Sequence, residues 1–169
     1  MPFAAINADE RVMELLGGAL SRAQSDVFIA ELERHFDAHG YGLWALELRE
    51  SGELIGLTGL NAVVFEARFT PAVELGWRLA HARWGEGYAS EAARAALRFG
   101  FERAGLAEIV AMTSVLNVRS QAVMERLGMH RDPGDDFVHP LARPRRLRPH
   151  VLYRLSAVEW ADWAATAPA

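Results

Sequence analysis

Residues 83–100, with the sequence RWGEGYASEAARAALRFG, constrain the fold of this chain more than any other segment. From Ala89 onward, small and apolar residues recur at alternating spacings of three and one, which is the pattern of one helix face. They are Ala89, Ala92, Ala93, Ala96, Leu97, Gly100, Phe101 and Ala104. Gly105 follows, where a C-terminal cap belongs. We therefore predict a helix that begins just after a turn with two glycines and ends at Gly105.

The hydrophobic patterns around this segment predict alternating helices and strands. Two helical patterns come first, and Gly40 ends the second of them. Apolar residues at 44, 46 and 48 alternate with their neighbours, and Ser51-Gly52 turns the chain into a hairpin. Helices are expected at 2–16, 22–39, 89–104 and 119–127, and strands in the 41–65 hairpin and at 72–80, 108–115 and 150–158. This order predicts an α/β fold with a mixed central sheet flanked by helices.

Two residue types are missing from the sequence, and each absence excludes a class of chemistry. The 169 residues include no cysteine, so the chain has no disulfide, no thiolate metal ligand and no cysteine nucleophile. They include no lysine, which excludes a P-loop and a pyridoxal Schiff base. We expect no metal site. The length suits one domain with one core, so we expect a single domain over residues 1–169.

The charge of the chain bears on its partners and its location. The net charge is −4, which does not favour binding to nucleic acid or to an anionic membrane. Charged residues at 9–11 lie where a signal peptide would be apolar. The longest apolar stretch, near residues 54–65, is shorter than the roughly 20 residues that a membrane span needs. We therefore expect a cytoplasmic protein that binds neither nucleic acid nor membrane.

The turn around Gly85 and Gly87 has two interpretations. Both glycines permit positive φ, so that successive N–H groups can point into one concavity at the start of the next helix. Such a concavity binds an anion, although a plain strand-to-helix turn also favours glycine. A dinucleotide site is disfavoured, because Ser90 stands where a third glycine or an alanine is needed. The end of the next strand also lacks the acidic residue of such sites and has Ser114 and Val115 instead.

Asn117 and Ser120 follow the next strand of the predicted sheet. If two parallel strands each lead into a helix, these residues lie beside the glycine turn, and a ligand lies between the strand ends. Asn117 taken alone is better explained as the N-cap of a short helix. Together with the turn, the pair favours the interpretation as an anion site.

These segments together resemble the GNAT superfamily of acyl-CoA-dependent acyltransferases. The family motif (Q/R)-x-x-G-x-(G/A) corresponds to residues 84–89, with Trp84 in place of Gln or Arg and with Arg83 one residue earlier. The series ELGWRLA, WGEGYASEA, NVRSQAV and RLGM is most similar to the branch of ribosomal-protein N-terminal acetyltransferases (RimJ/RimL type). The resemblance extends from about Trp44 to Trp160. The family usually opens with a strand, whereas Met1 leads directly into a helical pattern, so we expect that edge strand to be missing or the start codon to be misassigned.

The resemblance implies acetyl-CoA as co-substrate and an amine as acceptor. The pyrophosphate would lie on backbone N–H groups near residues 84–90, and the pantetheine arm would lie along residues 77–79 like an added strand. The residues implied in cofactor binding are Trp77, Arg78, Leu79, Arg83, Trp84, Gly85, Glu86, Gly87, Tyr88, Ala89, Ser90, Asn117 and Ser120.

The chemistry implied is direct attack of a neutral amine on the thioester, since no cysteine can carry the acetyl group. We expect Ser120 to protonate the leaving thiolate, Asn117 to hold the pantetheine amide and Glu74 to act as base or to hold a water. Ser120 could equally be a capping residue, and Glu74 could simply be an exposed strand residue. Asp136, His139 and His150 are further candidates for the base.

Three functions remain open from the sequence. The first is an N-acetyltransferase, and the second is an acyl-CoA-binding module without catalysis. The third is an RNA-associated protein that uses the arginines at 143, 145, 146 and 148, which the acidic composition disfavours. Those arginines could also meet an acidic acceptor or a partner subunit, although a solvated hairpin before the last strand explains them better. Trp160 and Trp163 are expected in packing or in dimer contacts, and a homodimer is left open.

Overall fold

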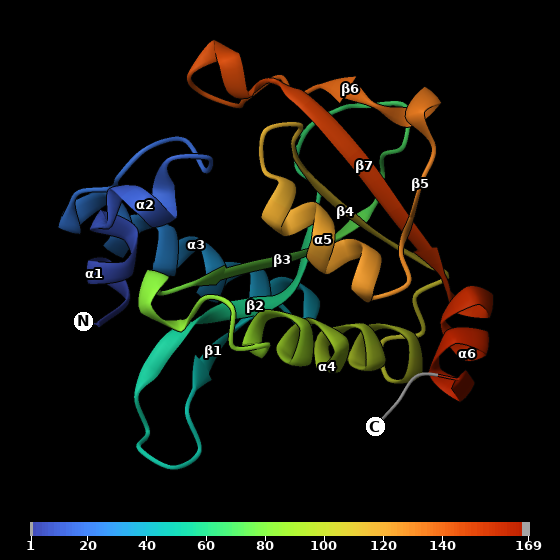
Figure 1. The fold of residues 1–169 in the computed structure, drawn as a ribbon, viewed down its shortest axis with the longest axis horizontal. Helices are drawn as coiled ribbons and strands as arrows, with labels where there is room; N and C mark the ends of the chain where they lie inside the picture. The colour runs from blue at the N-terminus through green and yellow to red at the C-terminus, as the bar shows by residue number, and fades with distance from the viewer. Residues whose placement is uncertain (1, 167–169) are drawn as a thin grey trace.

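A mixed sheet with helices on both faces organises residues 2–166, the part of the chain that the computed structural model describes (Figure 1). Within these residues the sheet has seven strands in the order β1-β2-β3-β4-β7-β5, and β6 pairs with β7. The strands are β1 (Leu43–Glu47), β2 (Leu54–Ala62), β3 (Val73–Leu79), β4 (Glu108–Ser114), β5 (His130–Arg131), β6 (Phe137–Val138) and β7 (Pro149–Ser156). The helices are α1 (Pro2–Ala8), α2 (Glu10–Met13), α3 (Arg22–His39), α4 (Tyr88–Glu102), α5 (Val118–Arg126) and α6 (Ala157–Thr166).

The small-residue pattern forms α4, which packs against one face of the sheet. Gly100 shows why the residues on this face are small: a Cβ there would lie 2.6 Å from Cδ1 of Ile109 and 2.8 Å from Cδ1 of Leu60. Leu75 and Leu97 are buried in the same core, between the sheet, α4 and α5. The close approach of helix and sheet therefore excludes larger side chains along this line.

The other face of the sheet is covered by the N-terminal helices. Leu57 of β2 packs there with Phe3, Val12 and Leu32 in a second core cluster. The predicted helix at 2–16 is in fact two short helices, because the side chain of Asp9 accepts a hydrogen bond from the backbone N–H of Arg11 and caps α2. α1 begins at Pro2, in agreement with the helical pattern predicted for this segment.

The C-terminal part contains elements that the sequence pattern did not predict. The predicted strand at 150–158 ends at Ser156, and α6 begins at the next residue. The short strand β5 and the 3-10 segments at Pro133–Asp135 and Arg145–Leu147 were also missed. β6 pairs with β7 and forms the hairpin that was expected before the last strand. Trp160 of α6 is buried and stacks on Phe101 of α4, with ring centroids 5.7 Å apart, so its role within the chain is packing.

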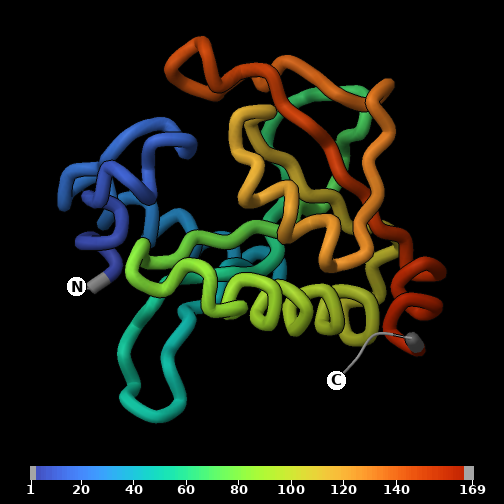
Figure 2. Tube along the Cα trace, viewed as in Figure 1, coloured from blue at the N-terminus to red at the C-terminus, as the bar shows by residue number. Residues whose placement is uncertain are grey.

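The two central strands, β3 and β4, diverge along their length, and the candidate site lies in the gap between them. β3 pairs with β2 in an antiparallel ladder from Gly56↔Leu79 to Ala62↔Val73. With β4 it is parallel, and among the described residues it shares the single pair Glu74↔Val110. Beyond this pair the strands diverge toward their carboxyl ends (Figure 1). The N-terminal helices lie beside the turn that follows β3, at the open end of the gap (Figure 2).

Candidate active site

The end of β3 presents backbone groups that its neighbours do not use. The N–H of Ala80 donates to the carbonyl of Ile55 on β2 at 2.8 Å. Because alternate residues of an antiparallel strand face the same neighbour, the backbone groups of Arg78 face β2, and those of Trp77 and Leu79 face the opposite side. β4 has diverged there, so these groups form a free strand edge. The carbonyl of Leu79 is an exception, since it accepts a hydrogen bond from Nε1 of Trp84 at 3.0 Å.

The glycine turn follows this free edge directly. Gly85 and Gly87 have φ of +81° and +89°, and a Cβ built on either glycine would have no atom within 4 Å. Gly87 is the N-cap of α4 and provides no side-chain cap. Its carbonyl accepts hydrogen bonds from the N–H groups of Ser90 and Glu91. The first N–H groups of a helix have no partner inside the helix, so those near Tyr88 point toward open space. This is the geometry that an anion seat requires.

A cavity of about 1050 Å³ joins the free edge of β3 to the glycine turn. Its walls come from four segments: residues of 11–16 around α2, residues 77–79 of β3, residues of the 81–90 turn and residues of 116–126 around α5. Every residue predicted to contact the cofactor lines this cavity, except Glu86. Glu74 does not line it. The wall from the α2 region was not predicted from the sequence.

Asn117 and Ser120 lie at the start of α5, across the gap from β3. Asn117 is the N-cap of α5: its Oδ1 accepts from the N–H of Ser120 at 3.2 Å, and its Nδ2 donates to Oγ1 of Thr113 at 3.0 Å. The capping interpretation of Asn117 is thus confirmed, and its amide retains one N–H for a ligand. The hydroxyl of Ser120 makes no hydrogen bond to any described residue. The structure therefore gives Ser120 no capping role and places it in the cavity wall.

Arginines surround the glycine-turn end of the cavity. The guanidinium of Arg119 lies over the ring of Trp84, with Cζ 4.9 Å from the ring centroid, and links α5 to the turn. Nε of Arg126 donates to Oγ of Ser90 at 3.4 Å. Arg83 pairs with Glu53 of the β1–β2 hairpin. These cations would attract a polyanionic ligand to this end of the cavity.

Glu74 is half-buried near the start of β3, where the strand still pairs with β4. Its side chain lies on the sheet face opposite α4, since it alternates with Leu75 in the α4-side core. Burial raises its pKa from 4.5 to about 7. Its Cα is about 10 Å along the strand from that of Trp77, since a strand rises about 3.3 Å per residue. A base at this position would act through a water.

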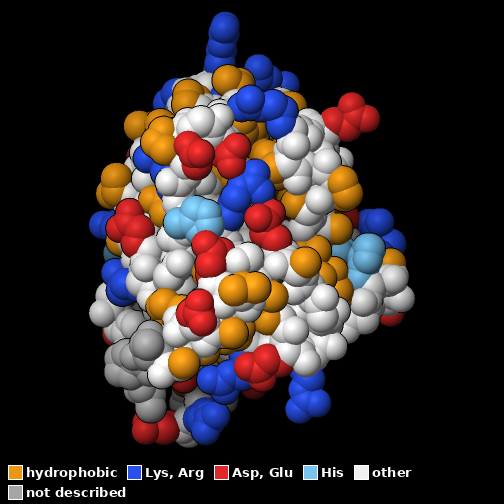
Figure 3. Space-filling view, turned by 90° about the vertical axis from the view of Figure 1, so that its right-hand side faces the viewer, with side chains coloured by type: hydrophobic (Ala, Val, Ile, Leu, Met, Phe, Trp, Pro, Cys, Tyr) orange, Lys and Arg blue, Asp and Glu red, His pale blue; other side chains and the backbone are white. Residues whose placement is uncertain are grey.

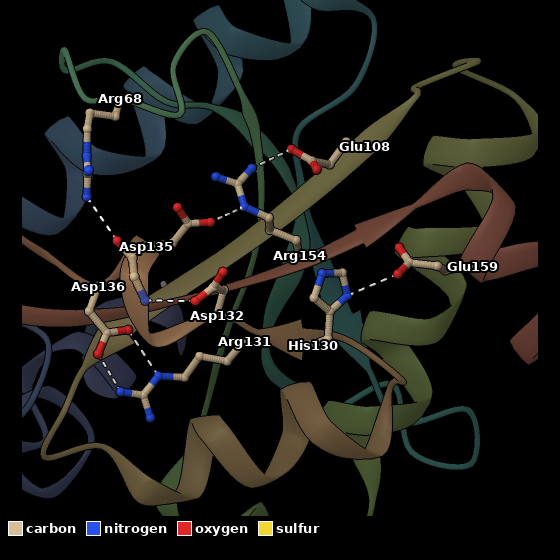
Figure 4. Close-up of polar contacts among 10 residues, drawn as sticks. Arg68, Glu108, His130, Arg131, Asp132, Asp135, Asp136, Arg154 and Glu159 are labelled. Carbon is tan, nitrogen blue, oxygen red and sulfur yellow. Dashed lines mark hydrogen bonds and ion pairs between the residues drawn. The ribbon is translucent and has the colours of Figure 1, made fainter.

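Asp136, a further candidate for the base, already forms an ion pair. The partner of Asp136 is Arg131, and the neighbouring Asp135 forms a separate ion pair with Arg154 (Figure 4). Acidic and basic side chains are interleaved over that face of the molecule (Figure 3). These pairs hold Asp136 in a structural role.

The two histidines differ in their tautomers. Nδ1 of His139 accepts the N–H groups of Leu141 and Ala142, so Nε2 carries the proton, and burial lowers the pKa of His139 to about 4. Nδ1 of His150 donates to the carbonyl of Arg148, which leaves a lone pair on Nε2. Burial lowers the pKa of His150 as well. His150 is therefore chemically able to accept a proton, but neither histidine lines the cavity.

Residues 2–166 contain no helix that is long and apolar enough to span a bilayer. Within the same range, no three His, Asp or Glu side chains come together as a metal site would require.

Known proteins resemble this chain in both sequence and structure. Residues 1–130 match the family described as acetyltransferase (GNAT) domain. The Bacillus subtilis (strain 168) protein YkkB is 31% identical over 128 residues, which cover 76% of this chain and 73% of YkkB. The structure of the acetyltransferase from Agrobacterium tumefaciens str. C58 has a TM-score of 0.72 and 31% identity, and the match covers 91% of this chain and 82% of that chain. The Vibrio cholerae spermidine N-acetyltransferase, in complex with CoA and spermine, has a TM-score of 0.73 over 94% of this chain and 90% of that chain, at 16% identity, which compares the fold alone.

Proposed function

This chain belongs to the acetyltransferase (GNAT) family, and on that premise we propose that it transfers the acetyl group of acetyl-CoA to a primary amine. The predicted GNAT fold is confirmed, and the family makes the chain an acyltransferase. One observation carries the proposal. The cavity joins a free strand edge at Trp77 and Leu79 to a glycine turn with open space above both glycines. An extended amide-containing arm that ends in a pyrophosphate matches both parts.

The free edge of β3 and the glycine turn bind different parts of acetyl-CoA. The backbone groups of Trp77 pair with the amides of the pantetheine arm, as a neighbouring strand would. The N–H groups near Tyr88 receive the pyrophosphate, and the open space at Gly85 and Gly87 lets it approach the backbone. The residues predicted from the sequence, except Glu86 and the side chain of Arg78, are assigned this role on their place in the cavity wall.

The transfer step uses groups on both sides of the gap. The N–H of Leu79 donates to the thioester carbonyl and stabilises the negative charge that develops there. Glu74, deprotonated above a pKa of about 7, removes a proton from the amine through a water. The amine nitrogen bonds to the acetyl carbon, the carbon–sulfur bond breaks, and the Ser120 hydroxyl donates a proton to the departing thiolate. Ser120 then takes a proton from water, and Glu74 releases the proton of the amine to water. An α-amine, with a pKa of about 8, needs less help from the base than a lysine-type amine at about 10.4.

The proposal requires both substrates to be bound together. The test is release of free thiol from acetyl-CoA in the presence of an acceptor panel: amino acids, peptides with free N-termini and spermine. The peptides test the finer assignment to the RimJ/RimL-type branch. Initial-rate plots at several fixed acceptor concentrations should intersect, as for a ternary complex. Parallel plots with a trapped acetyl-serine would replace direct transfer with a ping-pong scheme.

The second candidate function is an acyl-CoA-binding module without catalysis. It is favoured by one observation, namely that no candidate base lines the cavity. Acetyl-CoA that binds with no thiol release toward any acceptor in the panel would select this function.

A further inference from the structure

The side chain of Arg78 occupies an unusual position on β3. The side chain of Arg78 lies on the sheet face covered by α1 and α3. The side chains of its sequence neighbours Trp77 and Leu79 lie on the opposite face. Nη1 of Arg78 donates to Oδ1 of Asn7 at 2.6 Å. The guanidinium lies over the ring of Phe28, with Cζ 4.9 Å from the centroid, and 6.0 Å from the centroid of Phe3. Its surroundings are thus a neutral amide and two aromatic rings.

The charge of Arg78 has no acidic partner among residues 2–166. No carboxylate of these residues lies within 4.0 Å of it, whereas the half-buried Arg83 and Arg154 both form ion pairs. Nε of Arg78 is shielded from solvent and makes no hydrogen bond within the described residues. Burial lowers its pKa to about 10, so the group stays charged at neutral pH. Arg78 is partly buried and lines the cavity, and a cation with little water around it and no counter-charge favours an anion beside it.

Few donors of Arg78 remain for a ligand. Nη1 donates to Asn7 and Nε is shielded from solvent, so the nitrogen left for a ligand is Nη2. The N–H groups of a charged guanidinium form their strongest hydrogen bonds with anionic oxygens, such as those of a carboxylate.

The side chain of Arg78 is placed to contact the acceptor and not the phosphates of the cofactor. Arg78 lines the same cavity as the glycine turn, but its side chain is directed to the α1–α3 face, and the turn leads into α4 on the opposite face. Glu74 lies on the same face of β3 as Arg78. Between them, a Cβ on Gly76 would meet only Cδ2 of Leu43, at 3.9 Å. An acceptor that pairs with Arg78 inside the cavity lies next to Trp77, where the thioester is expected.

We propose that the acceptor is an amino carboxylic acid, whose carboxylate pairs with Nη2 of Arg78 while its amine faces the thioester. This inference rests on the proposed acetyltransferase function and names its substrate class. Arg78 was predicted from the sequence as part of the cofactor edge. Its backbone faces β2, so its side chain has a separate role on the acceptor side.

The experiment compares amino acids with their carboxamides as acceptors, in thiol-release assays on the full chain. The wild-type protein should prefer the acid over its amide by roughly 10- to 100-fold in kcat/KM, as expected for hydrogen bonds to a charged group. Arg78→Gln should reduce this preference to less than about 3-fold, mainly through a higher KM for the acid. Its affinity for acetyl-CoA should stay unchanged. Arg78→Lys keeps the charge but not the planar guanidinium, and should retain part of the preference.

Arg22→Gln is the matched control, because Arg22 is exposed on α3 and pairs only with Asp26 among the described residues. It should keep both the preference and the acetyl-CoA affinity. If the wild-type protein acetylates acids and amides equally well, or if folded Arg78→Gln keeps the preference, the inference is wrong while the acetyltransferase function stands. If acetyl-CoA binds but no amine is acetylated, the proposed function itself fails. If Arg78→Gln does not fold, the comparison of acids and amides with the wild-type protein and with Arg78→Lys still tests the inference.

Discussion

Gly87→Ala tests the proposed phosphate site, because its effect on stability and its effect on acetyl-CoA affinity can be measured separately. At a φ of +89°, a residue with a Cβ is strained by about 1–2 kcal/mol. The new methyl group meets no atom within 4 Å, so no clash adds to this strain. Since 1 kcal/mol shifts Tm by about 2–4 °C in a domain of this size, Tm should fall by roughly 2–8 °C and the fold should persist.

The effect on acetyl-CoA binding should be larger than the effect on stability. The added Cβ projects into the space where the pyrophosphate is expected to approach the backbone. Loss of one hydrogen bond to a charged group costs about 1.5–3 kcal/mol. This corresponds to a dissociation constant for acetyl-CoA that is roughly 10- to 150-fold weaker, measured by isothermal titration calorimetry.

Gly105→Ala provides the matched control at the other end of α4. Gly105 has a φ of +65°, a Cβ there also meets no atom within 4 Å, and the residue does not line the cavity. It should lose comparable stability and keep the wild-type affinity. Unchanged affinity in folded Gly87→Ala, or equal weakening in both variants, would refute the placement of the pyrophosphate at this turn.

Two further substitutions test the transfer step. Ser120→Ala should lower kcat by roughly 10²-fold with unchanged acetyl-CoA affinity; a lower Tm with normal kcat would mark Ser120 as structural. The kcat of the wild-type protein should rise as pH increases through about 7, the pKa at which Glu74 becomes a base, and Glu74→Gln should abolish this rise. Because burial raises this pKa from 4.5, wild-type stability should fall between pH 4.5 and 7, by up to about 3 kcal/mol, and Glu74→Gln should not show this loss in pH-dependent melting. A pH–rate profile that is the same in wild type and Glu74→Gln would exclude Glu74 as the base.

The parts of the fold that follow local patterns were predictable from the sequence. The spacing from Ala89 to Ala104 predicted α4, because the face that touches the sheet must be small at every turn. Gly40, with φ of +74°, ends α3 where predicted. The break at Asp9 was not predicted, because the residues on both sides of it continue one helical pattern and only the cap separates them. The end of β7 was misplaced by two residues because Ala157 and Val158 suit a strand as well as a helix.

In the candidate site, too, some features could be predicted from the sequence and others could not. Gly85 and Gly87 could be identified from the sequence, because a tight turn before a helix has a local signature. The divergence of β3 from β4 could not, since strand pairing depends on residues far apart in the chain. The environment of Arg78 depends on Asn7, 71 residues away, and no local pattern encodes that contact. A lone arginine within the apolar run LGWRLA was the available signal.

The most direct test of the acetyl-CoA site is a crystal structure of this chain with CoA bound. We expect the pantetheine arm to pair with the free edge of β3 at Trp77 and Leu79, in the gap that β4 leaves. We expect the pyrophosphate within hydrogen-bonding distance of backbone N–H groups between Trp84 and Ser90. CoA bound elsewhere on the chain, or in this cavity with no phosphate contact to the turn, would contradict the placement of the site.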